Sequence, residues 1–79
     1  MSYETVFPEK AAAVVKSDST RFKTKSTIYV GTGGNVVVIP WGNEKDTPIT
    51  FAIGDGGVVP VAVRAVLDAS TAVNMVRVF

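Results

Sequence analysis

Few residues in this chain of 79 have side chains that could do chemistry, and they are scattered. The sequence contains no histidine and no cysteine, so the usual general base and the commonest ligands of zinc are missing. A serine nucleophile would therefore need a lysine as its base, for example Ser26 with Lys25 or Lys16. Nothing around these residues marks such a pair. We predict no catalytic residue and no enzymatic activity.

The seven acidic residues form no recognisable catalytic or metal-binding pattern. Most of them stand in turn-like stretches, where aspartate is a common turn former. Asp55 lies between two glycines and, with Asp18 or Asp46, could offer oxygen ligands to calcium. An isolated Asp-Gly pair is more typical of a turn. We therefore predict no metal and no cofactor.

Two glycine-rich stretches, GTGG at 31–34 and GDGG at 54–57, raise the question of a phosphate-binding loop. Neither is followed by the Lys-Ser/Thr pair and the helix of such a loop, and neither has the full dinucleotide-binding spacing. Glycine also supplies the positive φ that tight reversals need. We predict a hairpin loop at 31–34 and a second turn at 54–57.

The net charge of +1 argues against nucleic acid as a partner, since a nucleic-acid-binding domain carries a basic stripe. The local basic run of Arg21, Lys23 and Lys25 around Phe22 leaves two interpretations open: a solvated strand face or a contact with an acidic partner surface. No apolar run has the length of a membrane span. The first ten residues lack the apolar region of a signal peptide. We expect no contact with a membrane.

The elements that would position these residues are strands. Fifteen residues are valine, and β-branched side chains favour strands. The pattern predicts an all-β fold, a single small antiparallel β-sandwich or barrel without significant helix. Residues 1–10 form an N-terminal arm and residues 11–79 the domain. About six strands are expected, at 10–16, 26–30, 35–40, 48–53, 58–68 and 73–79.

The composition indicates assembly with other subunits. Hydrophobic residues make up 47% of the chain, and the mean hydropathy is +0.30. A domain of this size has a marginal core and usually needs a disulfide, a metal or a partner. The predicted strand at 58–68 is mostly apolar on both faces, as expected for a strand buried on both sides. We therefore expect a homo-oligomer.

Five residues are candidates for the interface: Tyr3, Phe7, Trp41, Pro60 and Phe79. Trp41 begins a polar loop, and it either folds over the open end of its own sandwich or anchors in another chain. Tyr3 and Phe7 in the arm present the same choice. Pro60 places its part of the strand at an edge or a bulge. Phe79 ends the sequence, where a large ring suits a domain rim or a subunit seam.

The order of motifs resembles small virion proteins of tailed phages, above all the head-spike base family of gene transfer agents and related phages. The resemblance covers the chain from about residue 11 to its end. It is carried by an SDS turn at 17–19, YVG at 29–31 and TF at 50–51, by the glycine step into a valine-rich strand at 57–63, and by a last strand ending in an aromatic residue at 76–79.

This resemblance implies a non-enzymatic structural protein on the outer surface of a phage capsid, either a cement protein or the base of a head spike. Its partners would be the major capsid protein, further copies of itself in a homotrimer or homopentamer, and a spike or fibre protein. It would be made in the host cytoplasm and reside in the virion. Two alternatives stay open: a tail, neck or baseplate adaptor, and a small glycan- or peptide-binding β-module.

Overall fold

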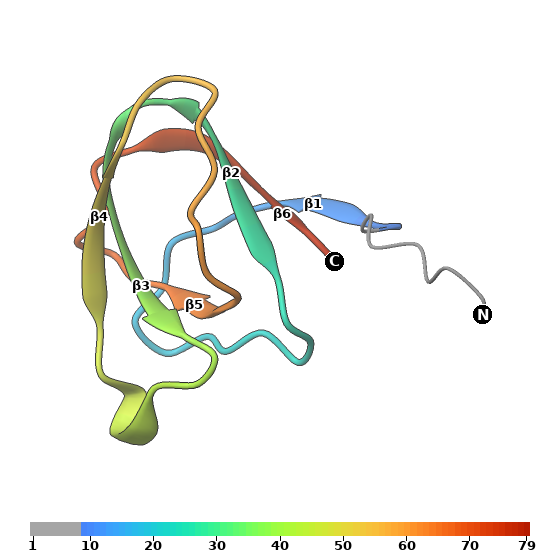
Figure 1. Ribbon diagram of the computed structural model, residues 1–79, viewed down its shortest axis with the longest axis vertical. Coiled ribbons are helices and arrows are strands. Elements are labelled where there is room, and N and C mark those ends of the chain that lie inside the picture. The colour runs from blue at the N-terminus through green and yellow to red at the C-terminus, as the bar shows by residue number, and fades with distance from the viewer. Residues whose placement is uncertain (1–8) are drawn as a thin grey trace.

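The computed structural model of the protein describes residues 9–79, which form strands in two small sheets (Figure 1). The prediction of an all-β chain with about six strands is confirmed. A single 3₁₀ turn at Glu44–Asp46 is the only helical element in this part of the chain, and none of its helices could span a membrane. The strands are β1 (Ala11–Ala13), β2 (Thr27–Thr32), β3 (Gly34–Pro40), β4 (Ile49–Ile53), β5 (Val63–Val66) and β6 (Val73–Val78).

The first sheet has the order β1-β6-β2 and the second the order β4-β3-β5, with every pair antiparallel. Backbone hydrogen bonds outside the strands join the two sheets. The amide of Val30 in β2 donates to Gly57 O over 2.8 Å, and the amide of Ser17 donates to Val66 O in β5 over 3.0 Å. The segments before β2 and before β5 thus extend the backbone hydrogen bonding of the strands. They link the two sheets at their edges, as in a partly closed barrel.

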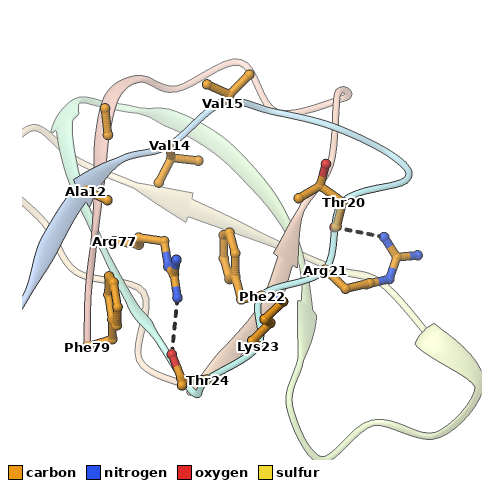
Figure 2. A pocket seen from close by; sticks show the side chains of 11 residues that line it. Ala12, Val14, Val15, Thr20, Arg21, Phe22, Lys23, Thr24, Arg77 and Phe79 are labelled. Atoms are coloured by element: carbon orange, nitrogen blue, oxygen red, sulfur yellow. Dashed lines mark hydrogen bonds between the residues drawn. The ribbon is translucent and has the colours of Figure 1, made fainter.

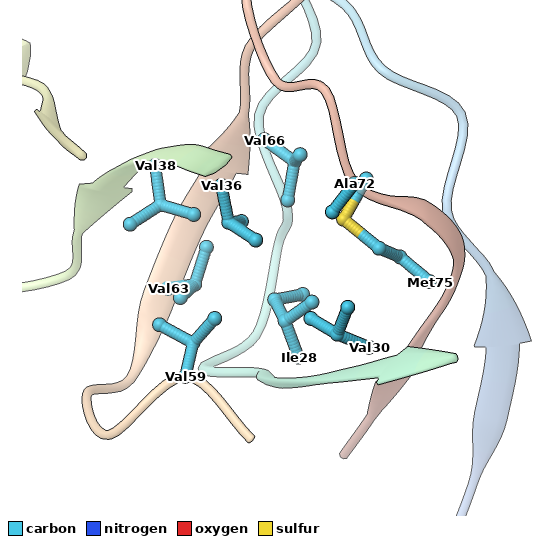
Figure 3. Packing of buried hydrophobic residues seen from close by; sticks show 9 residues of the cluster. All are labelled: Ile28, Val30, Val36, Val38, Val59, Val63, Val66, Ala72 and Met75. Carbon is cyan, nitrogen blue, oxygen red and sulfur yellow. The ribbon is translucent and has the colours of Figure 1, made fainter. Parts of the chain in front are cut away.

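The core between the sheets is built mainly from valine (Figure 3). Alternate residues of a strand point to the same face, so β2 and β3 each send every second side chain inward. Removing these side chains from water stabilises the fold by about 25 cal/mol per Å² of apolar area. The buried cluster consists of Ile28, Val30, Val36, Val38, Val59, Val63, Val66, Ala72 and Met75.

The long strand predicted at 58–68 is wrong in its extent. β5 covers only the second half of this stretch, and the chain bends at Pro60, which has no amide hydrogen to donate to a ladder. Before the bend, Val58 forms an isolated bridge with Tyr29 of β2. The pairing of β3 with β5 skips Arg64, and such a bulge turns the extra residue out of the regular pattern.

The hairpin predicted at 31–34 is also wrong. β2 and β3 belong to different sheets, and the chain turns a corner between them. We call residues 31–34 the glycine corner. None of its glycines has a positive φ. A Cβ added to Gly31 would lie 2.8 Å from Asn74 Cβ, and one added to Gly34 would lie 2.8 Å from Ala72 N. Glycine is required here because two backbones approach closely.

The turn predicted at 54–57 is confirmed. The amide of Gly57 donates to Gly54 O over 3.0 Å, and Gly56 has a φ of 73°. A positive φ at the third position is the signature of a type II turn and favours glycine. The two glycine stretches are similar in sequence but need glycine for different reasons. Residues 31–34 need it for close backbone approach, and residues 54–57 need it for a positive φ.

Candidate functional site

A groove of about 520 Å³ opens at the side of the first sheet (Figure 2). Residues 12–15 line one side, residues 20–24 line the other, and Arg77 and Phe79 lie between them. Ala12 and Arg77 are directly paired across β1 and β6, so their side chains share a face of the sheet. We call this site the Arg77 groove.

The side chain of Arg77 is held from several directions. Its guanidinium carbon lies 4.3 Å from the ring centre of Phe22 and 3.8 Å from that of Phe79, distances that allow cation–π attraction to both rings. Its Nε donates to Ser26 Oγ over 3.0 Å and its Nη2 to Thr24 Oγ1 over 3.2 Å. These contacts fix the guanidinium in one orientation and leave Nη1 without a partner among residues 9–79.

The hydroxyl of Ser26, the serine considered above as a nucleophile, is part of this arrangement. It is buried, donates to Thr24 O over 3.0 Å and accepts the hydrogen bond from Arg77. Lys16 is not its partner, because the ammonium of Lys16 donates to Ser70 O over 3.0 Å. The structure therefore uses Ser26 to orient an arginine.

Basic residues gather around the Arg77 groove. A smaller pocket of about 280 Å³ adjoins it and shares Thr24 and Phe79 with it. Three basic residues line the groove and two line the adjoining pocket, which makes five of the eight in the chain. These are Arg21, Lys23 and Arg77, and Lys10 and Lys25. The basic run noted in the sequence is thus one side of a larger basic surface, with Phe22 inside it.

The opposite face of the first sheet is apolar. Cross-strand pairs place Ala13, Val76 and Tyr29 in one row across β1, β6 and β2, and Val58 extends this row beyond β2. Tyr29 is 43% exposed and Val58 50% exposed. We call this face the outer face. Its members are Ala11, Ala13, Thr27, Tyr29, Val58, Val76 and Val78, and none of them is charged.

Trp41 is half-buried and contacts its own domain. The guanidinium carbon of Arg64 lies 4.9 Å from its ring centre, and Arg64 Nη2 donates to Trp41 O over 2.6 Å. The amide of Trp41 donates to Ala62 O over 2.8 Å. Arg64 reaches this position because it is the bulged residue of β5. A contact of Trp41 with another chain stays a prediction.

The other interface candidates lie in different surroundings. Tyr3 and Phe7 fall outside the described residues. Pro60 is exposed at the bend before β5. Phe79 lines the Arg77 groove, whereas Trp41 and Pro60 do not. Participation of these residues in an interface stays a prediction, and so does the boundary between the arm and the domain.

The three aspartates considered as calcium ligands make separate contacts. Asp55 Oδ1 accepts from the amide of Gly33, Asp18 Oδ1 accepts from the amide of Asp68 over 3.0 Å, and Asp46 pairs with an arginine. Within residues 9–79, no three acidic side chains come together as metal ligands would. Each of these carboxylates ties one loop to another part of the chain.

Sequence reasoning singled out Phe79 and the basic run but missed Arg77, which is the centre of the groove. One signal was present, because alternate residues of a strand share a face and the spacing of Arg77 and Phe79 places them together. The partners from residues 22–26 lie some fifty positions away in the sequence, so their approach depends on how the first sheet is assembled.

No protein-family model matches the chain, and no curated protein is similar to it in sequence. Its function is therefore inferred from the outer face, from the Arg77 groove and from the order of motifs described above.

Proposed function

We propose that the protein is a structural component of a tailed-phage virion that decorates the outside of the capsid, as a cement protein or as the base of a head spike. The observation that carries the proposal is the outer face, where Ala13, Val76, Tyr29 and Val58 form an uncharged row. Contiguous exposed apolar residues mark contacts with other proteins. The motifs that resemble head-spike base proteins favour a virion as the assembly concerned.

The proposed role agrees with the physical chemistry of a small domain. A domain of this length gains little stability from its own core, and burial of the outer face against a partner adds binding energy to the folded state. The partners would be the major capsid protein and further copies of the chain, as a homotrimer or homopentamer on a symmetry axis of the capsid. A spike base would also hold a spike or fibre protein.

Light scattering on a sizing column tests the assembly directly. We expect a trimer or a pentamer for the purified protein, and dissociation when Tyr29→Lys introduces a charge on the outer face. Thr50→Lys is the matched control, because Thr50 is an exposed strand residue of β4 in the other sheet. A monomer that also fails to bind capsids would refute the proposal.

The position in the virion is tested by the number of copies per particle. Quantitative mass spectrometry of purified particles would give many copies, or a multiple of the vertex number, for a capsid protein. A tail, neck or baseplate adaptor would instead be present in about six or twelve copies, as the symmetry of the tail axis requires. A copy number of about six or twelve would therefore favour the adaptor over the capsid protein.

A small peptide-binding module is the second candidate, because the Arg77 groove is a surface of a different kind from the outer face. Val76 of the outer face and Arg77 of the groove are neighbours in β6, so their side chains point to opposite sides of the first sheet. One domain can therefore use one face for assembly and the other for recognition.

A further inference from the structure

We infer that the Arg77 groove binds an extended acidic segment of a partner protein in which carboxylates alternate with apolar side chains. The inference goes beyond the virion role and does not depend on it, because the residues that carry it, Arg77 with Phe22 and Phe79 above all, are not part of the outer face. It follows from three features of the groove: an arginine already held in place, an apolar lining, and further basic residues in the groove and the adjoining pocket.

The first feature is the arrangement of Arg77. A guanidinium offers its N–H groups along separate edges, and the edge formed by Nε and Nη2 is used by Ser26 Oγ and Thr24 Oγ1. The Nη1 group is left to donate to a ligand. Because the rings of Phe22 and Phe79 hold the cation on both faces, it loses little conformational freedom when a carboxylate binds.

The second feature is the apolar surface beside this cation. Ala12 and Val14 line one side of the groove and Phe22 the other, with Phe79 next to Arg77 (Figure 2). A ligand made only of charged groups would leave this surface in contact with water. Apolar side chains between the carboxylates of a peptide would cover it, and burying such area favours binding.

The third feature is the position of the other basic residues. Lys10 and Lys25 line the adjoining pocket, whereas Lys23 lines the groove itself. Positive charge is thus divided between the groove and the adjoining pocket, which suits a ligand with several separate carboxylates. A polyphosphate chain fits less well, because it is charged along its whole length and has no apolar groups to cover the lining formed by Ala12, Val14 and Phe22.

Selection from a random peptide library on the immobilised full-length protein tests the inference. We expect enriched peptides in which aspartate or glutamate alternates with apolar residues. The selection is repeated with Lys23→Glu, in which an exposed residue of the groove reverses its charge, and with Lys45→Glu as the control. Lys45 is exposed, does not line the groove, and gives the same change in net charge.

Fluorescence anisotropy with the most enriched peptide then measures affinity. We expect Lys23→Glu to weaken binding about fivefold, as for loss of a charge pair near the surface, and Lys45→Glu to leave it within about twofold. Arg77→Lys keeps the charge but loses the planar fork, so it should weaken binding by about tenfold or more. If this variant fails to fold, Lys23→Glu decides the question.

Three results would overturn the inference. The first is an enriched set of peptides without acidic residues. The second is equal weakening of binding by Lys23→Glu and Lys45→Glu, which would show a general charge effect. The third is tighter binding of a single-stranded oligonucleotide than of the acidic peptide, which would show that the surface serves nucleic acid.

Discussion

The substitution Gly34→Ala tests the glycine corner. A methyl group on Gly34 would lie 2.8 Å from Ala72 N and 2.9 Å from Thr71 Oγ1. These neighbours cannot easily retreat, because the amides of Thr71 and Ala72 both donate to Asn35 O, over 2.8 and 3.1 Å, and Thr71 Oγ1 accepts from Asn35 N over 2.9 Å. The methyl group therefore forces apart two segments that hydrogen bonds hold together.

The expected loss follows from this geometry. Inserting a methyl group into a tightly packed site costs about 1–3 kcal/mol, which is a large share of the ~4–12 kcal/mol expected for a chain of this length. A loss of about 2 kcal/mol lowers the Tm of such a domain by about 8–16 °C. Gly42→Ala is the matched control, because a Cβ there meets nothing within 4 Å. This change should stabilise the fold by about 0.4–1 kcal/mol.

Thermal unfolding followed by circular dichroism measures both variants, at one protein concentration because oligomers melt in a concentration-dependent way. A third variant, Gly33→Asn, separates the corner from a hairpin. Asn-Gly is the preferred sequence of a two-residue hairpin turn, so it would stabilise a hairpin, whereas a Cβ on Gly33 lies 2.8 Å from Ile53 O in the corner. Stabilisation by Gly33→Asn together with an unchanged Tm for Gly34→Ala would refute the reasoning.

Three further predictions concern the interior and the tryptophan. Ser70→Ala removes the buried hydroxyl that accepts from Val37 N over 2.8 Å and donates to Val37 O, and it should cost about 1–3 kcal/mol in urea unfolding; an unchanged midpoint would contradict this. Ile28→Ala empties a fully buried site and should cost about 2–5 kcal/mol in the same assay, whereas a loss well below about 2 kcal/mol would contradict its place in the core. Arg64→Lys should cost about 0.5–1 kcal/mol and change the emission spectrum of Trp41, the only tryptophan; an unaltered spectrum would exclude the stacking of Arg64 on its ring.

The strands could be predicted from the sequence because each depends on local side-chain properties. Valine favours strand geometry wherever it stands, which is why the valine run of β3 is predicted as a strand. Which of its residues face inward, Val36 and Val38, is shown by the structure. The extent of the fifth strand could not be predicted in the same way. Pro60 indicated an irregularity, but the position of the bend depends on the pairing of Val58 with Tyr29.

The glycine corner and the Arg77 groove could not be predicted because both depend on residues that are distant in the sequence. A glycine can indicate either a positive φ or the close approach of two backbones. At Gly34 the structure shows the second case, because Ala72 lies directly beside it. Likewise, the sequence around Arg77 is that of a solvent-exposed strand residue. Only the structure shows its contacts with Phe22 and Ser26. The basic run indicated a surface but not the cavity behind it.

The strand order of the first sheet has a consequence for how the protein is made. β1 and β2 do not pair with each other, because β6 lies between them. A nascent chain can form the second sheet once β5 has left the ribosome, but the first sheet has to wait for Val73–Val78. During synthesis the apolar strands β1 and β2 therefore remain without their partner, which is a state prone to aggregation. The first sheet can therefore form only after β6 has been made.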